Sequence, residues 1–355
     1  MTRIRTFART SRLICLITAV VACGLPAAPC AAAERATDST ARDAPARRVV
    51  ARRATVTRPV ARRPAARSRA AARARTLKEA KEPRFKLDDN GALVPDLRAA
   101  AAIIYNPTTG QVLWEENSTN QRSIASITKV MTATAFLESN PDPLREVVVQ
   151  RGDVRAASTT YLRAGNRVTV DNLLHLLLIA SDNAAARVLA RVSPYGADGF
   201  VIRMNEKAQE LGLENTSYAD PSGLLATNVS SAYDMAKLIT FAAGDDRIGS
   251  IMRTPYYSFN VGRGVITVHS TNQLVMNGDV DLVGGKTGFI SKAGYCLATL
   301  LRLPQGGPQV AVVVLGATSN AGRFWETRHL FNWLSTKAQD ALAVVPGLTA
   351  PGAAQ

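Results

Sequence analysis

Hydrophobic and polar positions along the chain predict strands near both ends of a folded region and helices between them. Two short apolar runs flank a turn-rich segment at 106–110, which predicts a β-hairpin. Densely spaced apolar residues predict buried helices at 127–137 and 170–192, and a last helix is expected at 325–337. Strands are expected at 99–105, 111–114, 282–283, 295–303 and 310–315. This order predicts one α+β domain in which the N- and C-terminal strands share a sheet.

Residues 1–33 have the three-part layout of a secretory signal peptide. Four arginines precede an apolar run at 13–22, and small residues follow up to Ala33. The apolar run is shorter than the roughly 20 residues that cross a bilayer. The segment ending in Cys23 also resembles a bacterial lipobox, so lipidation of that cysteine is an alternative. We therefore expect an exported, periplasmic protein, either free or anchored as a lipoprotein.

Residues 34–86 form a basic arm with 17 Lys and Arg against five Asp and Glu. Their Ala-, Arg- and Pro-rich composition cannot bury enough apolar surface to offset the entropy cost of ordering, which predicts disorder. The tail at 341–355 is also predicted to be disordered. The arm either contacts anionic wall or membrane polymers electrostatically or is a solvated spacer. Salt-dependent binding to isolated cell wall distinguishes these two hypotheses.

The net charge of +15 belongs to the N-terminal segments, because residues 87–355 carry 22 basic and 23 acidic residues. A globally basic nucleic-acid-binding domain is therefore excluded. Three of the four cysteines lie within residues 1–33, which excludes a disulfide-stapled scaffold. The three histidines form no zinc-binding pattern, so we expect neither a metal nor another cofactor.

The sequence Ser126-Ile127-Thr128-Lys129 places a nucleophile and a base on one helix face. At the start of a helix these two positions lie about one turn apart, so the lysine amine can reach the serine hydroxyl. The helix N-terminus also offers free backbone N–H groups to a developing negative charge. Taken alone, the same spacing also fits an exposed helix cap beside a solvated lysine.

Two further motifs contain polar residues suited to binding a peptide. Lys286-Thr287-Gly288 follows two glycines and offers a cation and a hydroxyl on a strand edge, although a glycine-rich turn has the same composition. Ser181 and Asn183 form a Ser-x-Asn triplet that interrupts a buried helical stretch, where polar groups need partners. The order of the motifs selects this triplet over the others at 118–120, 258–260 and 270–272.

Ser-x-x-Lys, Ser-x-Asn and Lys-Thr-Gly in this order resemble the signature of the penicillin-recognising serine acyltransferases. The resemblance is closest to the low-molecular-mass penicillin-binding proteins, which are serine D-alanyl-D-alanine peptidases, and among them to the endopeptidase type. It implies a β-lactamase/transpeptidase-like fold for residues 87–340, with an antiparallel sheet packed against a helical region. The remaining cysteine, Cys296, then falls on a core strand and is expected to be buried and inert. Stretches at 124–133, 220–224, 230–236, 270–272 and 286–296 carry the resemblance.

The resemblance also implies a catalytic role for three residues. Ser126 is expected to be the acylated nucleophile, Lys129 the base that takes its proton, and Ser181 the relay to the leaving amine. Lys129 must be neutral part of the time, which requires its pKa to fall from about 10.4. Burial and a second cation, for which Lys286 is the candidate, are expected to lower that pKa.

The same resemblance implies the substrate-binding residues. Asn183 is expected to bind the substrate amide, and Lys286 and Thr287 the carboxylate beside the scissile bond. Gly288 allows close approach of the substrate backbone, and the N–H groups of Ser126 and Phe289 are expected to bind the oxyanion. The implied substrates are peptidoglycan stem peptides, with β-lactams as covalent inhibitors.

Several other functions remain to be distinguished. A β-lactamase is disfavoured, because the only Glu residues between the second and third motifs are Glu206, Glu210 and Glu214, and none is in a Glu-Pro-x-x-Asn context. The uncharged tail at 344–355 cannot form a basic amphipathic anchor, which favours an endopeptidase. A D-alanyl-D-alanine carboxypeptidase is the main alternative, and a non-catalytic penicillin-binding sensor or an anion-binding protein is less favoured.

Overall fold

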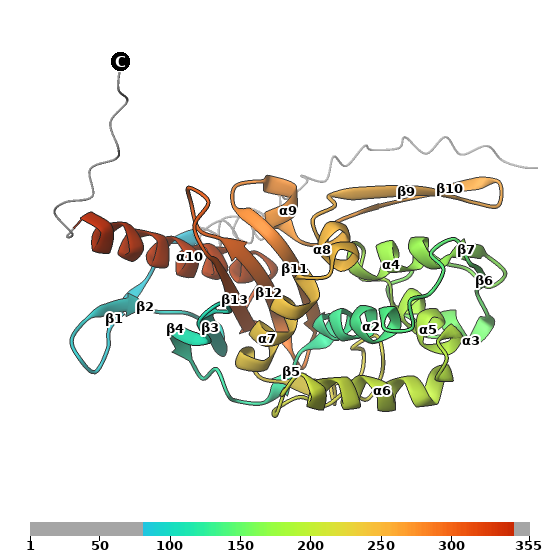
Figure 1. Cartoon of the computed structure of the whole chain (residues 1–355), viewed down its shortest axis with the longest axis horizontal. Coiled ribbons are helices and arrows are strands. Elements are labelled where there is room, and N and C mark those ends of the chain that lie inside the picture. Colours follow the sequence, from blue (N-terminus) through green and yellow to red (C-terminus); the bar gives the residue numbers. More distant parts are fainter. Residues whose placement is uncertain (1–80, 344–355) are drawn as a thin grey trace, which may run out of the picture. The chain divides into compact units, whose positions relative to one another are not determined.

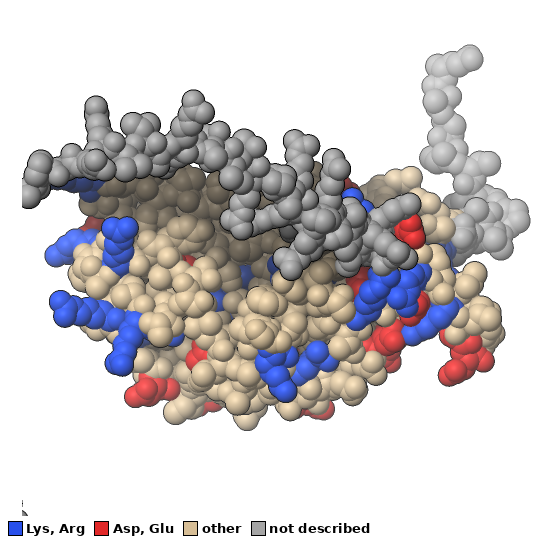
Figure 2. Space-filling view, turned by 180° about the vertical axis from the view of Figure 1, so that it is seen from behind, with Lys and Arg blue, Asp and Glu red and all other residues tan. Residues whose placement is uncertain are grey.

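The computed structural model describes residues 81–343, with side chains up to residue 339. The predicted signal peptide, residues 34–80 of the basic arm and the tail at 344–355 lie outside the described residues. Among the described residues, no helix is both long and apolar enough to cross a membrane. Both signs of charge are scattered over the face shown in Figure 2, in keeping with the near-balance of charge in residues 87–355.

A five-stranded antiparallel sheet forms the centre of the domain, and the N- and C-terminal strands share it as predicted (Figure 1). The α+β fold class is therefore confirmed. Along the sheet, the strand order is β11 (Asp281–Ile290), β12 (Gly294–Arg302), β13 (Gln309–Ala317), β3 (Ala101–Asn106) and β4 (Gln111–Glu116).

Four small antiparallel pairs of strands surround this sheet. They were not predicted, because most of these strands are very short and lack a long apolar run. The pairs are β1 (Phe85–Leu87) with β2 (Leu93–Pro95), β5 (Arg122–Ser123) with β8 (Val229–Ser230), β6 (Glu146–Val148) with β7 (Arg167–Thr169), and β9 (Tyr256–Val261) with β10 (Gly264–His269).

Both faces of the central sheet are buried, because successive side chains on a strand point to opposite faces. Ile103 and Val313 face the helical region, whereas their neighbours Ile104 and Val312 pack under the C-terminal helix. This explains why these strands are continuously apolar in sequence rather than alternating. The helices are η1 (Ala125–Ile127), α2 (Thr128–Leu137), α3 (Arg151–Val154), α4 (Val170–Leu178), α5 (Asn183–Val192), α6 (Gly196–Glu210), α7 (Ala232–Ala243), α8 (Asp246–Met252), α9 (Gln273–Asn277) and α10 (Asn320–Ala343).

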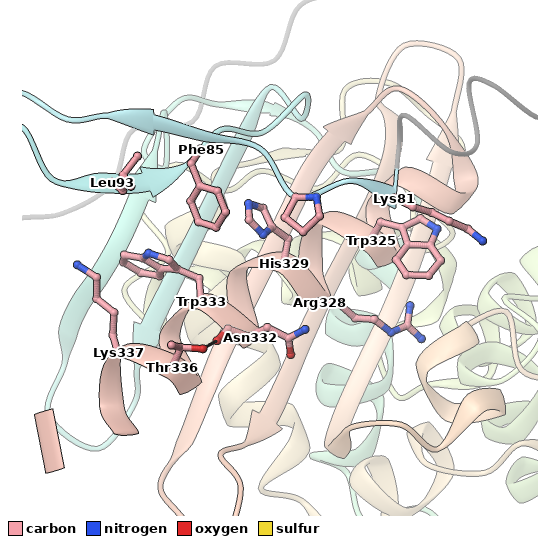
Figure 3. Close-up of a pocket in the computed structure, with 11 residues that line it drawn as sticks. Lys81, Phe85, Leu93, Trp325, Arg328, His329, Asn332, Trp333, Thr336 and Lys337 are labelled. Carbon is pink, nitrogen blue, oxygen red and sulfur yellow. Dashed lines mark hydrogen bonds between the residues drawn. The ribbon is translucent and has the colours of Figure 1, made fainter. Parts of the chain in front are cut away.

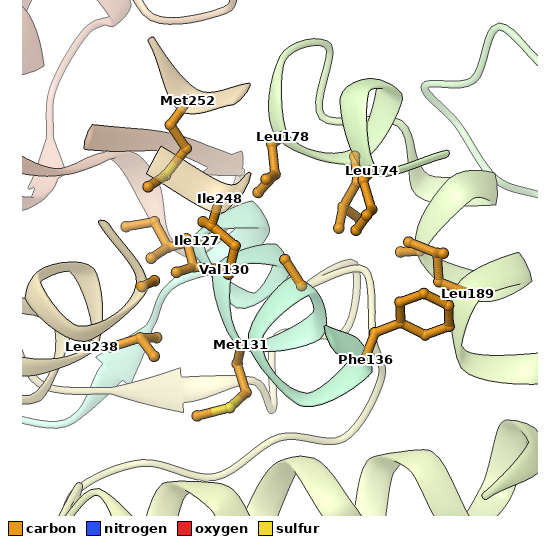
Figure 4. Close-up of a cluster of buried hydrophobic side chains, with 14 of the residues drawn as sticks. Ile127, Val130, Met131, Phe136, Leu174, Leu178, Leu189, Leu238, Ile248 and Met252 are labelled. Atoms are coloured by element: carbon orange, nitrogen blue, oxygen red, sulfur yellow. The ribbon is translucent and has the colours of Figure 1, made fainter. Parts of the chain in front are cut away.

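Helix α2 is buried on every side. Its apolar side chains, among them Met131 and Phe136, belong to the core cluster (Figure 4), and the helix packs against α4, α5, α6 and α7. Full burial explains the lack of a polar face in its sequence. The surrounding helices hold its N-terminus, and with it Lys129, in a fixed position.

Three boundaries differ from the sequence expectations. The stretch at 170–192 is two helices, because Asp182 caps the N-terminus of α5 by accepting a hydrogen bond from Ala185 N. The predicted end of the disordered arm, residue 86, falls inside β1, where the chain is already paired with β2. The last helix already begins at Asn320. Cys296 is buried in β12 as expected, and burial raises the pKa of its thiol.

Candidate active site

Ser126 lies in the turn η1, directly before α2. Lys129 is the second residue of that helix, and its Nζ lies 2.9 Å from Ser126 Oγ. The two side chains therefore meet across one turn, as expected from the sequence. The preceding residue, Ala125, has a φ of +49°, a left-handed conformation that is uncommon for a residue other than glycine.

Lys129 is fully buried and has two acceptors besides Ser126. Its Nζ donates to Asn183 Oδ1 at 2.7 Å and to the carbonyl oxygen of Ser222 at 2.5 Å. Burial lowers the pKa of Lys129 to about 7, with a smaller contribution from the positive charge of Arg187, and against the effect of nearby carboxylates. The predicted lowering of the Lys129 pKa is present, with burial as its main cause and Arg187 as an additional cation; the expected repulsion between Lys129 and Lys286 lowers the pKa of Lys286.

A second lysine lies behind the other serine of the site. Lys286, on the edge strand β11, donates from Nζ to Ser181 Oγ at 2.9 Å and to the carbonyl oxygen of Thr287 at 3.1 Å. Burial holds its pKa well below the ordinary range, and the positive charges of Lys129 and Arg323 lower it further. Ser181 itself has a φ of +60°, so the break between α4 and α5 presents its hydroxyl to Lys286.

Asn183 links the two halves of the site. Its Oδ1 accepts from Lys129, and its Nδ2 donates to the carbonyl oxygen of Ala157 at 2.7 Å. An amide oxygen has two lone pairs and an amide nitrogen two protons, so one acceptor and one donor position are left for a ligand. The Asn183 side chain is therefore held between Lys129 and Ala157, and it can make at most one donated and one accepted hydrogen bond with the substrate.

A carboxylate-centred loop fixes the carbonyl of Ser222 beside Lys129. Asp220 accepts hydrogen bonds from the backbone N–H groups of Ser222, Gly223 and Leu225 at 2.7–2.9 Å, and from Asn228 Nδ2 at 2.6 Å. Although burial opposes the effect, these bonds lower the pKa of Asp220. The stretch at 220–223 thus holds the carbonyl oxygen that accepts from Lys129. This role was not predicted from the sequence.

The backbone of β11 passes very close to Ser126. A Cβ on Gly288 would lie 2.6 Å from the carbonyl oxygen of Ile124 and 3.2 Å from Ser126 N. Only glycine permits this approach, and it brings the N-terminal end of α2 and the strand edge into one pocket. The next residue, Phe289, is half-exposed, and its ring stacks on Tyr295 with centroids 4.2 Å apart.

A cleft of about 430 Å³ opens over these residues. Ser126, Ser181, Asn183, Thr287, Gly288 and Phe289 line it, so six of the eight residues singled out from the sequence meet at one surface. Lys129 and Lys286 lie beneath it, both buried: Lys129 contacts Ser126 and Asn183 of the cleft, and Lys286 contacts Ser181 and the carbonyl oxygen of Thr287.

Among the cleft residues that were not singled out in the sequence, two make hydrogen bonds with residues of the Lys-Thr-Gly motif. Thr271 shares a hydrogen bond of 2.6 Å with Thr287 between their hydroxyls. Arg323, on α10, donates to the carbonyl oxygens of Gly288 and Cys296, and burial lowers its pKa to about 10. Thr271 lies in one of the repeated Ser-x-Asn triplets, which was a usable signal, whereas nothing local distinguishes Arg323 from other arginines of the chain.

The profile of the D-alanyl-D-alanine carboxypeptidase family, peptidase S11, matches residues 88–319. The chain belongs to this family. It is therefore a serine-type D-alanyl-D-alanine peptidase, and the resemblance drawn from the three motifs is confirmed. The match includes every motif residue discussed above.

Relatives and solved structures agree with this assignment. The D-alanyl-D-alanine endopeptidase of Pseudomonas aeruginosa is 33% identical over 69% of this chain and 79% of its own length. The D-alanyl-D-alanine carboxypeptidase DacF of Bacillus subtilis is 32% identical over 62% of this chain and 58% of its own length. The crystal structure of the Streptomyces K15 DD-transpeptidase matches 67% of this chain and 97% of its own, with a TM-score of 0.63 and 28% identity.

Proposed function

We propose that this peptidase is an endopeptidase that hydrolyses D-alanyl cross-links of peptidoglycan through an acyl-enzyme on Ser126. The contact between Ser126 Oγ and a lysine amine of lowered pKa carries the proposal. Similarity to several curated D-alanyl-D-alanine endopeptidases supports the specificity. The alternative, a carboxypeptidase that trims stem peptides, is supported by somewhat weaker similarities to carboxypeptidases.

The partners of Lys129 explain how it activates the serine. A neutral amine has two N–H donors and one lone pair. The carbonyl oxygens of Asn183 and Ser222 can only accept, so they take the two N–H groups. The lone pair is then left for the hydroxyl proton of Ser126. Transfer of this proton to Lys129 allows Ser126 Oγ to attack the carbonyl carbon of the scissile bond.

The remaining groups complete acyl transfer. The N–H groups of Ser126 and Phe289 bind the oxygen that becomes negatively charged. As the C–N bond breaks, the proton that Lys129 took from Ser126 passes through the hydroxyl of Ser181, which Lys286 holds, to the leaving amine, so Lys129 and Ser181 end in their starting states. Lys129 then takes a proton from the water that attacks the ester carbonyl and returns it to Ser126 Oγ as the ester bond breaks.

The structure modifies the expected carboxylate contact. Lys286 is buried, whereas the hydroxyls of Thr271 and Thr287 line the cleft beside Arg323. We assign the direct contact with the substrate carboxylate to these hydroxyls, with the Arg323 guanidinium supplying positive charge behind them, while Lys286 holds Ser181. Gly288 makes room for the turn that carries Ser126 and not for the substrate, contrary to the sequence expectation, and Asn183 accepts or donates one further hydrogen bond.

We also propose that the protein is exported to the periplasm, free or lipidated at Cys23, and that the basic arm contacts anionic polymers. The sequence patterns of residues 1–86 support these proposals. With the arm and the tail flanking it, the peptidase domain occupies the described part of the chain.

The acylation rate is expected to depend on pH through Lys129. The amine acts as a base only when neutral, so below a pKa of about 7 the rate constant falls about tenfold per pH unit. Above that value it levels off. Stopped-flow acylation by a fluorescent penicillin across this range measures the profile. In Arg187→Gln, loss of a positive charge is expected to raise the pKa of Lys129 and so to shift the midpoint of the acylation profile to higher pH. An acylation rate that does not depend on pH would contradict Lys129 as the base.

Purified cross-linked muropeptides and benzylpenicillin test the function directly. We expect monomeric muropeptides to appear from dimers, and mass spectrometry to find a stable penicillin adduct on Ser126. Untouched dimers with release of terminal D-alanine from pentapeptides would identify the carboxypeptidase. Rapid loss of the adduct with hydrolysed drug would identify a β-lactamase, and an adduct without any peptide cleavage a sensor.

A further inference from the structure

A second groove, of about 610 Å³, lies between the β1–β2 hairpin and α10 (Figure 3). Trp325 and Trp333 of α10 and Phe85 and Leu93 of the hairpin line it. Helix α10 serves both sites, because Arg323 in its first turn reaches the cleft while the two tryptophans face the groove. None of the groove residues has a part in the acyl-transfer chemistry.

The walls of the groove are held in place by polar contacts. His329 Nε2 lies 2.8 Å from the carbonyl oxygen of Arg84, and the ring of Phe85 meets the imidazole edge-on with centroids 5.0 Å apart. Arg328 is fixed by two hydrogen bonds to Asp279, at 2.7 and 3.0 Å. The groove is therefore a preformed site, as is usual for ligand-binding clefts.

Apolar side chains line the groove, and cationic side chains border it at both ends. Phe85 and Leu93 remain 49% and 60% exposed although they face it. Lys337 Nζ lies 4.9 Å from the centre of the Trp333 ring, and Lys81 Nζ lies 5.1 Å from that of Trp325. Lysines on long flexible side chains can move aside when a ligand covers the indoles. Aromatic surface bordered by positive charge fits an anionic ligand with apolar faces.

We propose that this groove binds the glycan strand of peptidoglycan, separately from the peptide cleft. One face of a hexopyranose ring consists of C–H bonds, which pack against the electron-rich face of an indole. Trp325 and Trp333 are about 12 Å apart along the helix axis, a span that a short run of linked sugar rings covers. The choice of this glycan rests on the proposed function, because it is the polymer that carries the cross-links.

Polar groups of the groove suit the rest of such a ligand. The amide of Asn332 makes no side-chain hydrogen bond within residues 81–339, and it faces the groove beside the hydroxyl of Thr336. Both can bind sugar hydroxyls. Lys81, Lys337 and Arg328 can pair with carboxylates of the lactyl groups and stem peptides. An Arg-rich segment such as residues 34–80 carries the same sign of charge as this rim and is a poorer occupant.

Tryptophan fluorescence can report on the groove selectively. The chain has three tryptophans, and the third, Trp114, lies on β4 outside it. In a Trp114→Phe background, titration with peptide-free glycan strands is expected to give a saturable change in fluorescence. Asn332→Ala, at an exposed position, and Trp333→Ala are expected to weaken binding about threefold and at least tenfold. Penicillin acylation of both variants is expected to equal that of the parent.

Other results would overturn the proposal. Absence of glycan binding by the full chain would do so, as would unchanged affinity in both variants. Binding gained only after deletion of residues 344–355 would show that the tail occupies the groove. A concentration-dependent dimer abolished by Trp333→Ala, without glycan binding, would identify a second copy as the occupant. Glycan binding requires no hydrolysis, so it is measurable even if the dimers remain uncleaved and the proposed function fails.

Discussion

Replacing Ser126 with alanine is expected to abolish both acylation by penicillin and cleavage of muropeptide dimers. The variant keeps Lys129, whose remaining acceptors Asn183 and Ser222 still satisfy its N–H groups, so the fold is retained. Without the hydroxyl no covalent intermediate forms, and loss of a nucleophile of this kind costs about 10⁴-fold or more in rate. Intact-protein mass spectrometry and chromatography of the muropeptides measure the two losses.

Ser291→Ala provides a matched control, because this serine also lines the cleft but lies at its exposed rim. Its acylation rate is expected to stay within a factor of about two of the parent, in line with the small effects of most surface substitutions. Thermal unfolding of both variants should follow that of the parent. Turnover of either substrate by Ser126→Ala would refute the assignment of the nucleophile.

The second large effect is expected for Gly223→Ala. Gly223 has a φ of +79°, and a Cβ there would lie 2.0 Å from the carbonyl oxygen of Ala125 and 3.0 Å from Ser126 N. Both are backbone atoms, which cannot rotate away as a side chain could. The turn that carries Ser126 must therefore move, and we expect an acylation rate lower by more than about 100-fold. The same displacement is expected to lower the free energy of unfolding by about 3 kcal/mol or more.

Gly91→Ala is the control that separates the steric clash expected in Gly223→Ala from the strain of a positive φ. Gly91 has a nearly identical φ of +76°, but a Cβ there meets no atom within 4 Å. The free energy of unfolding of this variant is expected to fall by only about 1 kcal/mol, the cost of alanine in a left-handed conformation, and its acylation rate is expected to equal that of the parent. Stopped-flow acylation and denaturant unfolding of the two variants test this. Equal effects at both glycines would show that strain, rather than contact with the Ser126 turn, determines the loss.

The repeated Ser-x-Asn triplet shows how far sequence order could identify the site. Four such triplets occur, and motif order together with the buried helical context selected 181–183, which the fold brings to Lys129 and Lys286. The triplet at 270–272 also reaches the cleft through Thr271, while 258–260 lies in the hairpin strand β9. The spacing of polar residues cannot distinguish these cases, because it contains no information on which segments meet across the fold.

The sequence by itself determined the fold class, the strands of the central sheet, the helices around 127–137, 170–192 and 325–337, and the serine, lysine and glycine motifs of the site, but not the helices α6 and α7. These depend on local patterns, since burial of a strand or helix leaves apolar residues at regular positions along the chain. The tertiary structure decided the pKa of Lys129, the role of the Asp220 loop and the presence of Arg323 in the cleft. The groove between the β1–β2 hairpin and α10 is likewise visible only in the tertiary structure. Each of these arises where residues distant in sequence come into contact, because burial and electrostatic interaction depend on the neighbours that folding brings together.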